Sequence, residues 1–524
     1  MHKNPEMTLN RLRKYSTSEN PKFKRLYNCL YSMEFYKLAY SNIYSKPGNT
    51  TKASDGTTIE RINKLIQSLR DGTYQPTNLR RINIPKKNGK TRPISIPSFN
   101  DKLVQEIIRM ILEAIYENTF SDCSHGFRPN RSCHSALEKV RQQFQGTVWF
   151  IEGDIKGCFD SINHTILLNI LREKITDLKF IHLINLFLKA GYIENWKYHK
   201  TYSGTPQGSI ISPILSNIYL DKFDRYITDL KGIFDKGKTR RTTKEYRKLC
   251  SSIQCTRNRI KRGINVEKNM ERLKERLKTR RQNKIKCTDP MDPNYRRIRY
   301  IRYADDFIIG VVGNKKEAQE IKESIIEWMS KNLKLEVSEE KIKLTHNSEK
   351  IRFLGYDIIS VRNSQKKFDN CNIKLSVPYD VMVNFIIKNH FGKWWNNPKT
   401  KKDELKAVHK SELINSDELE ILQLYNTKLR SIYNYYSIAE NVYKIGNFYY
   451  ICLTSFMRTL AAKYNTSRVK LYKNKNYCQN KKIGITYKDK FYEFFHGPFK
   501  RLYKTLCNNN VYQNNIIDNK NGST

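Results

Sequence analysis

Three aspartates stand where they could hold divalent metal ions. Asp154 ends a short apolar run that begins at residue 148, and Asp305 and Asp306 interrupt a second run over residues 299–310. Both runs have the length and composition of buried strands, so the carboxylates are expected at strand ends. Mg²⁺ takes oxygen ligands, and two ions held by carboxylates can activate a hydroxyl and stabilise a phosphate leaving group. A lone Asp-Asp pair is usually a surface turn, but carboxylates beside apolar walls are costly unless a metal neutralises them.

Two hairpins are expected, one carrying the acidic pair and one elsewhere in the chain. Residues 299–310 predict two apolar strands with the acidic pair at their turn. Residues 79–85 and 92–97 predict a second hairpin, and the segment between them is basic. The second hairpin would therefore carry a positive tip.

The rest of the chain has a mainly helical pattern. Apolar residues at helical spacing predict a helix over 101–116, with Asn100 or Asp101 as its cap. Residues 1–75 and the chain after residue 361 are also expected to be mostly helical. The Asn-rich tail from residue 508 is expected to fray.

The charge balance of the chain favours one class of binding partner. The 524 residues include 96 Lys and Arg against 51 Asp and Glu, a formal net charge of +45. A compact protein with this much unbalanced charge repels itself unless a polyanion neutralises it, which favours nucleic acid over an anionic membrane. No apolar run is long enough to span a bilayer, and the N-terminus lacks the apolar segment of a secretory signal. The 11 scattered cysteines lack zinc-site spacing and are expected to be reduced thiols.

Two segments concentrate the positive charge. Residues 231–299 contain 24 Lys and Arg against 7 Asp and Glu, a net charge of +17. A solvated helix normally mixes both signs, so this imbalance predicts contacts to RNA phosphates. The C-terminal region interleaves Tyr with Lys and Arg, which suits stacking on unpaired bases beside phosphate contacts. The candidate RNA-binding residues are Lys261, Arg262, Arg280, Arg281, Arg468, Lys470 and Lys473.

Several longer strings resemble one family. Residues 303–306 read Tyr-Ala-Asp-Asp, which resembles the Tyr-X-Asp-Asp signature of reverse transcriptases. The strings at residues 124–129, 153–160, 204–209 and 353–356 resemble those of group II intron-encoded reverse transcriptase/maturases, in the same order. The chain is therefore identified as similar to that family from about residue 45 to residue 360, with weaker likeness to about residue 500.

The resemblance implies an α+β fold shaped as a right-hand polymerase. Residues 1–75 would be an N-terminal finger extension, and residues 76–360 the fingers and palm, with antiparallel sheet and the basic insertion at about 231–299. Residues 361–508 would form a helical thumb and maturase domain, and residues 509–524 a disordered tail. The matched strings also imply that Asp154, Asp305 and Asp306 bind two Mg²⁺ ions, with Mn²⁺ able to substitute. Asp160 is expected to act as a structural capping residue.

The resemblance further implies contacts to the incoming deoxynucleoside triphosphate. Lys86 and Arg92 would grip its phosphates, as a point charge and a bidentate fork can. Phe159 would lie below the sugar as a gate against a 2′-hydroxyl. Gln207 and Lys341 would lie near the nucleotide.

The implied partners are the parent group II intron RNA, an RNA template with a DNA primer, target DNA and deoxynucleoside triphosphates, in a bacterial cytoplasm or an organelle matrix. We expect RNA-directed DNA synthesis combined with assistance to intron splicing and mobility. Alternatives are a splicing-only maturase with a vestigial polymerase, a related bacterial reverse transcriptase with another role, and a viral-type RNA polymerase. Cys478 and Cys507 lack paired metal ligands, so no DNA endonuclease module is expected.

Overall fold

The computed structural model describes residues 4–44, 59–85, 91–155, 157–194, 197–199, 203–206, 208–281, 285, 287–289, 292–336, 342–361, 372–398 and 401–502. The chain divides into two compact units. The first comprises Met1–Ala136, Thr147–Thr243 and Thr288–His346. The second comprises Leu137–Gly146, Lys244–Cys287 and Asn347–Thr524. None of the described helices is long and apolar enough to cross a membrane.

The first unit combines helices with two four-stranded sheets. Its main helices are α1 (Pro5–Tyr15), α2 (Met33–Tyr44), α3 (Ile59–Arg70), α4 (Phe99–Tyr116), α6 (Cys158–Ser161), α7 (His164–Arg172), α8 (Leu178–Lys189), α9 (Ser212–Phe234) and α12 (Lys315–Leu333). Helix α5 (Cys133–Gln143) begins in the first unit and ends in the second. The strands are β1 (Leu79–Pro85), β2 (Thr91–Ile96), β3 (Trp149–Asp154), β4 (Tyr192–Glu194), β5 (Lys197–His199), β6 (Arg297–Tyr303), β7 (Asp306–Val312) and β8 (Lys343–His346).

One sheet, with strand order β6-β7-β3-β8, carries the three aspartates. Strand β7 is buried from Phe307 to Val312, which explains why its sequence is an unbroken apolar run. Gly153 is required in β3, because a Cβ there would lie 2.1 Å from the ring of Phe307. The predicted acidic hairpin is confirmed as β6 and β7.

The other sheet, with order β2-β1-β4-β5, confirms the second predicted hairpin, because β1 and β2 pair antiparallel. Its tip, residues 86–90, lies outside the described residues. The predicted helix over 101–116 is confirmed as α4, but its cap was wrong. Ser98 caps the helix by accepting a hydrogen bond from the backbone N–H of Asp101 at 3.2 Å. Asp101 instead accepts from the hydroxyl of Tyr74 at 2.5 Å.

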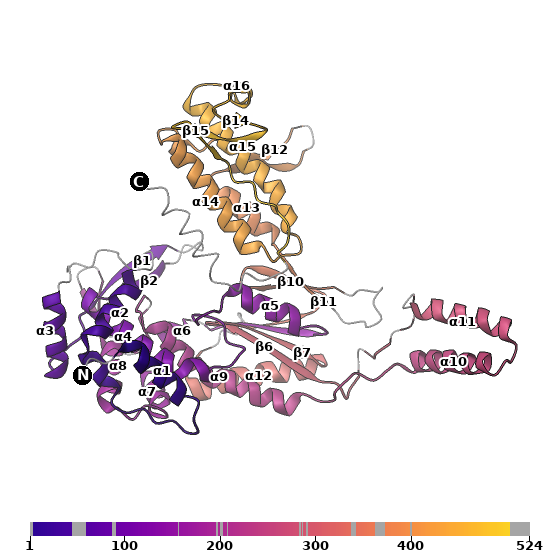
Figure 1. The fold of residues 1–524 in the computed structure, drawn as a ribbon, viewed down its shortest axis with the longest axis horizontal. Helices are drawn as coiled ribbons and strands as arrows, with labels where there is room; N and C mark the ends of the chain where they lie inside the picture. Colours follow the sequence, from indigo (N-terminus) through magenta and orange to yellow (C-terminus); the bar gives the residue numbers. More distant parts are fainter. Residues whose placement is uncertain are drawn as a thin grey trace. The chain divides into compact units, whose positions relative to one another are not determined.

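The second unit contains a pair of basic helices, α10 (Lys244–Lys261) and α11 (Val266–Arg281), which lie side by side (Figure 1). The buried Ile253 lies on α10, and Arg276 of α11 donates to the carbonyl of Ser252 at 3.0 Å. The guanidinium of Arg280 lies 5.9 Å from the ring centre of Tyr246. These contacts join α10 and α11 as a helical hairpin, called the basic hairpin below.

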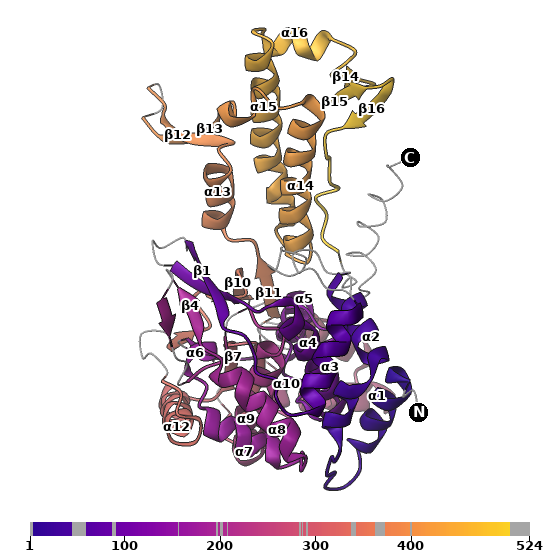
Figure 2. The same ribbon diagram turned by 90° about the vertical axis from the view of Figure 1, so that its left-hand side faces the viewer.

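The C-terminal part of the second unit mixes helices with short strands. Figure 2 shows α14 and α15 side by side, and α13 and α15 also pack together. Its elements are β9 (Ile351–Phe353), β10 (Tyr356–Val361), β11 (Asn372–Ser376), α13 (Tyr379–Lys388), β12 (Gly392–Asn396), β13 (Asp403–Ala407), α14 (Glu418–Tyr436), α15 (Ile445–Lys463), α16 (Arg468–Lys473), β14 (Cys478–Gln479), β15 (Lys482–Tyr487) and β16 (Lys490–Glu493). The predicted α+β class and C-terminal helices are confirmed, but the strands after β10 were not predicted.

Candidate active site

The sheet places the three aspartates on neighbouring backbone segments. Strands β3 and β7 pair antiparallel with Asp154 directly opposite Asp306. Residues opposite one another project to the same face, with Cβ atoms about 5 Å apart. Asp305 lies in the adjoining two-residue turn, and its carbonyl accepts from the backbone N–H of Ile155 at 3.4 Å. All three aspartates are partly exposed, so a ligand can reach them.

The turn before Asp306 is fixed by a loop from a distant part of the chain. Ala304 has a φ of +56°, which suits the first position of a tight hairpin turn and strains a residue with a side chain. A Cβ on Gly126 would lie 2.2 Å from the backbone nitrogen of Ala304, so only glycine lets the loop approach this closely. The backbone N–H of His125 also donates to the carbonyl of Arg302 at 2.9 Å.

Arg302 anchors this turn from inside the protein. Its fully buried guanidinium donates to both carboxylate oxygens of Asp224, at 2.8 and 2.6 Å. It also donates to Ser124 Oγ at 2.9 Å, Asn217 Oδ1 at 3.2 Å and the carbonyl of Ala304 at 2.8 Å. All five N–H groups of the guanidinium are therefore used, and one of them holds the turn at Ala304 directly.

Burial and neighbouring carboxylates shift the pKa values of the groups beneath the turn. Burial alone would lower the pKa of Arg302, but Asp224 holds it above its usual value. Burial raises the pKa of Tyr300 well above its usual value, and Asp224, which accepts from its hydroxyl at 2.6 Å, raises it further. Burial also raises the pKa of the Cys158 thiol to about 12, with a further contribution from Asp305. These groups therefore keep fixed protonation states over the working pH range.

The donor set suits a hard divalent cation, because every ligand offered is a carboxylate oxygen. No three His, Cys, Asp or Glu side chains among the described residues are gathered into a closed metal-binding group. The structure thus places Asp154, Asp305 and Asp306 on neighbouring backbone positions. Unneutralised carboxylates repel one another, and a bound cation would offset that repulsion.

Phe159 lies on α6, shortly after Asp154 in the sequence, and its backbone is tied to a second loop. The backbone N–H of Thr205 donates to the carbonyl of Phe159 at 2.5 Å. Gly204 has a φ of +85°, and a Cβ there would lie 2.6 Å from the carbonyl oxygen of Asp160. The expected capping role of Asp160 is wrong, because Gly157 is the N-cap and Asp160 lies within the first turn.

The same loop reaches the hairpin formed by β1 and β2. Gly208 has a φ of +105°, and a Cβ there would lie 2.6 Å from the carbonyl oxygen of Ser95 on β2. The buried Gln105 of α4 accepts from the hydroxyl of Ser209 at 2.9 Å and from the backbone N–H of Ile210 at 3.0 Å. The loop therefore places the backbone of β2 close to that of α6, which carries Phe159.

The remaining nucleotide-contact predictions fall largely outside the described residues. Lys86, Gln207 and Lys341 all lie in segments that the structure does not describe. The backbone of Arg92 pairs with Ile84 in the hairpin, but its side chain is not described. Their proposed contacts stay predictions.

Sequence reasoning assigned no role to Phe127. Its ring lies 6.1 Å from that of Phe159, in an edge-to-face arrangement at 73°. The only sequence signal was its place in the string 124–129, because an isolated Phe is ordinarily interpreted as a core residue.

The candidate RNA-binding residues lie on surfaces of the second unit. Lys261 and Arg262 are exposed at the end of α10, whereas Arg280 is partly covered by Tyr246. The side chain of Arg281 is not described. On α16, Lys470 and Lys473 are exposed and Arg468 is partly exposed.

Two other cations of the interleaved C-terminal pattern serve the fold. Lys463 donates to the carbonyls of Ile414 and Ser416 at 3.1 and 3.0 Å. Arg458 donates to the carbonyl of Ala407 at 2.5 Å. The alternation of Tyr with Lys and Arg in the sequence therefore overestimates how many of these cations can contact RNA.

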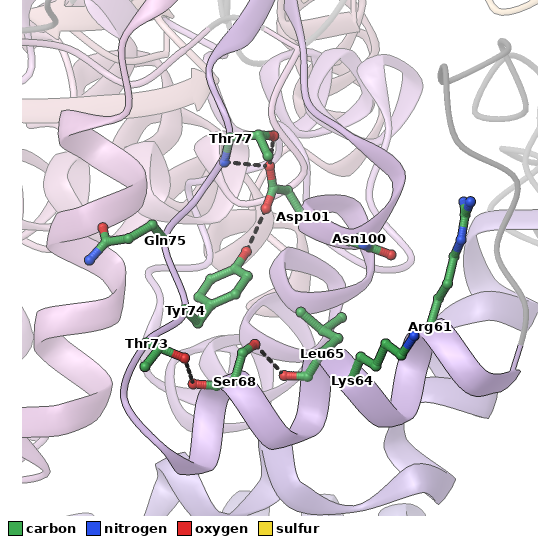
Figure 3. Close-up of a pocket in the computed structure, with 10 residues that line it drawn as sticks. All are labelled: Arg61, Lys64, Leu65, Ser68, Thr73, Tyr74, Gln75, Thr77, Asn100 and Asp101. Atoms are coloured by element: carbon green, nitrogen blue, oxygen red, sulfur yellow. Dashed lines mark hydrogen bonds between the residues drawn. The ribbon is translucent and has the colours of Figure 1, made fainter.

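A separate cavity of about 550 Å³ lies between α3, the segment after it and the start of α4 (Figure 3). Tyr74 and Thr77 are tied to Asp101 along its wall, and Arg61 and Lys64 line it from α3. None of the predicted site residues lines this cavity.

Comparison with known proteins adds an independent assignment. Residues 84–236 and 268–358 match the family described as reverse transcriptase (RNA-dependent DNA polymerase), and residues 370–505 match type II intron maturase. The unmatched interval 237–267 contains α10.

The group II intron-encoded protein LtrA of Lactococcus lactis subsp. cremoris is 45% identical over 458 residues, covering 84% of this chain and 75% of LtrA. A putative COX1/OXI3 intron 1 protein of Saccharomyces cerevisiae is 34% identical over 492 residues, covering 87% of this chain and 56% of that protein. Among solved structures, a telomerase from Candida albicans in complex with a fragment of telomeric RNA has a TM-score of 0.36 at 12% identity, over 76% of this chain and 64% of that chain.

Proposed function

The chain belongs to the family of group II intron-encoded reverse transcriptase/maturases, and we propose that Asp154, Asp305 and Asp306 carry its polymerase reaction. It is an RNA-directed DNA polymerase that also acts as a splicing maturase. Reverse transcriptases use divalent metal ions. The observation that carries the proposal is the register of β3 and β7, which sets Asp154 opposite Asp306 beside the turn of Asp305.

The metal centre is proposed to hold two Mg²⁺ ions, with Mn²⁺ able to substitute. Asp154 and Asp306 would hold them from adjacent strands, and Asp305 from the turn. When bound, such ions activate the 3′-hydroxyl of a primer and stabilise the departing pyrophosphate. Arg302 and the loop at Gly126 would keep the turn that carries Asp305 in place.

The nucleotide subsite is proposed to lie between α6 and the β1–β2 hairpin. Lys86 and Arg92 would hold the triphosphate, and Gln207 and Lys341 would contact the nucleotide. Phe159 would lie beneath the sugar, where its ring leaves no room for a 2′-hydroxyl. The loop that ties Phe159 to β2 supports this placement, because it brings the gate and the phosphate-binding hairpin to one site.

The partners are proposed to be the parent group II intron RNA, a primed RNA template and target DNA, with intron mobility as a second outcome of DNA synthesis. The basic hairpin and α16 would contact the intron RNA. The proposed division is an N-terminal extension to residue 75, fingers and palm to 360, and a thumb/maturase domain to 508. The working compartment would be a bacterial cytoplasm or an organelle matrix, as for the relatives.

Primer extension on poly(rA)/oligo(dT) with Mg²⁺ tests the polymerase site. The wild type is expected to incorporate dTTP, and Asp305→Ala is expected to lose incorporation because a metal ligand is removed. Asp229→Ala, an exposed aspartate of α9, serves as the matched control and should retain activity. A wild type that binds intron RNA but never extends the primer would instead indicate a splicing-only maturase.

A further inference from the structure

Phe127 is held in a conformation that its own side chain disfavours. Its φ is +56°, in the left-handed region that bulky residues rarely adopt, and 55% of the residue is exposed. An exposed ring gains little from burial, so burial of the Phe127 side chain does not account for this backbone conformation. Strained positions persist only where neighbouring structure enforces them, and they cluster at functional sites.

The residues on either side enforce this conformation. Gly126 is pressed against the backbone nitrogen of Ala304, so the chain before Phe127 is fixed to the catalytic turn. Arg128 is buried and donates to the carboxylate of Glu117 at 2.9 Å. It also donates to the carbonyl of Ser121 at 2.6 Å. Because Gly126 and Arg128 are both anchored, the side chain of Phe127 between them points outward.

The outward ring meets the ring of Phe159. Their centres are 6.1 Å apart and their planes cross at 73°, within the range of favourable edge-to-face pairs. The backbone of Phe159 is itself fixed, because its carbonyl accepts from Thr205. The remaining freedom of Phe159 lies in its side-chain torsions, and the neighbouring ring of Phe127 restricts them.

We infer that Phe127 braces the ring of Phe159 and thereby sets how strictly the site rejects ribonucleotides. This inference rests on the proposed role of Phe159 as the sugar gate. Without the brace, the gate ring can turn aside and admit a 2′-hydroxyl. Phe127 is therefore a positioning residue for sugar selectivity, acting through Phe159 and not on the phosphates.

The test measures the ratio of kcat/KM for dTTP to that for rUTP on poly(rA)/oligo(dT). Phe127→Ala and Phe127→Gly are expected to lower this ratio by about tenfold or more, the scale of a single pocket contact. Phe127→Tyr keeps the ring and should keep the ratio. The melting temperature of Phe127→Gly should equal or exceed that of the wild type, because glycine relieves the positive φ.

Asn130→Gly is the matched control, since Asn130 has a φ of +57° in the same loop and carries no ring. It should leave the ratio unchanged, so that loosening of the loop is separated from loss of the brace. Phe159→Ala separates the inference from the function on which it rests. If Phe159→Ala relaxes selectivity while both Phe127→Ala and Phe127→Gly leave it intact, the brace is wrong and the gate stands. If Phe159→Ala leaves the ratio unchanged, the proposed gate fails as well.

Discussion

At the scale of single residues, Arg302 links the turn before Asp306 to α9 through contacts that a shorter or unbranched cation cannot reproduce. Lysine offers three donors on one nitrogen, whereas the guanidinium uses a planar set of five. The partners of Arg302 are spread over Asp224, Ser124, Asn217 and Ala304. Position 302 therefore tests whether geometry at the turn, and not charge alone, supports catalysis.

Arg302→Lys is expected to lower kcat for dTTP incorporation by about 10²-fold, because small displacements of catalytic groups have effects of this size. The KM for dTTP should change little, since Arg302 is not proposed to touch the nucleotide. Steady-state primer extension separates the two constants. Arg109→Lys is the control, because Arg109 binds Glu106 and Glu113 on α4 and not the turn.

The double variant Arg302→Met with Asp224→Leu distinguishes positioning from folding. Removing both charges leaves no buried charge without its partner. The melting temperature of the double variant should therefore be closer to that of the wild type than the melting temperature of Asp224→Leu alone. Its kcat should remain low, because the carbonyl of Ala304 still lacks its donor. A double variant with normal kcat would show that this pair serves only the fold.

His164 gives the site a pH dependence of stability. Its Nε2 donates to the carbonyl of Gly204 at 2.7 Å, and burial lowers its pKa below the usual 6.5. The unfolded chain then binds the proton more readily, so the contribution of His164 is complete above about pH 6.5 and is lost as the pH falls toward the lowered pKa. His164→Gln keeps a donor without titrating, and its melting temperature should fall less than that of the wild type between about pH 7.5 and pH 5. Equal falls would exclude His164 as a source of the acid sensitivity.

At the scale of residues, only part of the site could be predicted from the sequence. The strings around Asp154, Phe159 and Asp305 carry signals that one chain can show. The network of Arg302 joins Ser124 to Asn217 and Asp224 of α9, two distant segments whose residues are individually ordinary. Nothing in a single sequence says which distant carboxylate a buried arginine will meet.

At the scale of elements, long periodic segments were predictable and short ones were not. Helix α4 and the hairpins of β1–β2 and β6–β7 follow clear apolar patterns. The hairpin of β15 and β16 turns at Lys488 and Asp489, both with positive φ, instead of the Asn-Gly or Asp-Gly that usually marks such turns. Its charged residues also hide the alternation by which a strand is recognised.

The turn between β9 and β10 illustrates how one element fixes another. Leu354 and Gly355 both have positive φ, and their carbonyls accept from the hydroxyls of Tyr435 and Tyr436 at 2.7 and 3.0 Å. Both tyrosines lie at the end of α14. The helix therefore holds the turn through two hydrogen bonds that the aromatic rings alone cannot supply.

The double variant Tyr435→Phe with Tyr436→Phe is expected to destabilise the chain by about 1–3 kcal/mol, since two turn carbonyls lose their donors. The midpoint of denaturant unfolding measures the change. Tyr443→Phe is the matched control, because Tyr443 is 64% exposed in the same unit. An unchanged midpoint for the double variant would mean that water replaces both hydroxyls without cost.

At the scale of the whole molecule, positive charge is the dominant property. The basic hairpin contributes to it and can be deleted by joining the backbone at its base. The backbone at its base is closed by a bridge between Thr242 and Thr288, and the backbone N–H of Asp289 donates to the carbonyl of Arg241 at 2.8 Å. Bridged backbones lie about 5 Å apart, so a short Gly-Ser linker can replace residues 244–286. That segment holds 16 Lys and Arg against 4 Glu, a net charge of +12.

Excising the basic hairpin is expected to weaken binding to group II intron RNA while leaving dTTP incorporation on poly(rA)/oligo(dT) intact. The slope of log affinity against log salt should become shallower by about one unit for each phosphate that the variant no longer neutralises. Fluorescence anisotropy over a KCl series measures that slope. Within the hairpin, Lys261→Ala with Arg262→Ala and Arg280→Ala should give a smaller change of the same sign.

A triple variant of α12 controls for charge alone, with Lys316, Lys322 and Lys331 changed to Ala. If it changes the slope as much as the hairpin triple, the RNA responds to total charge and not to a particular surface. If only the hairpin variants change it, the basic hairpin is the part that binds the intron, and its helix α10 lies in the interval that the reverse transcriptase family match omits. That result would separate the two activities within one chain, because DNA synthesis would depend on β3 and β7 and intron binding on an insertion outside them.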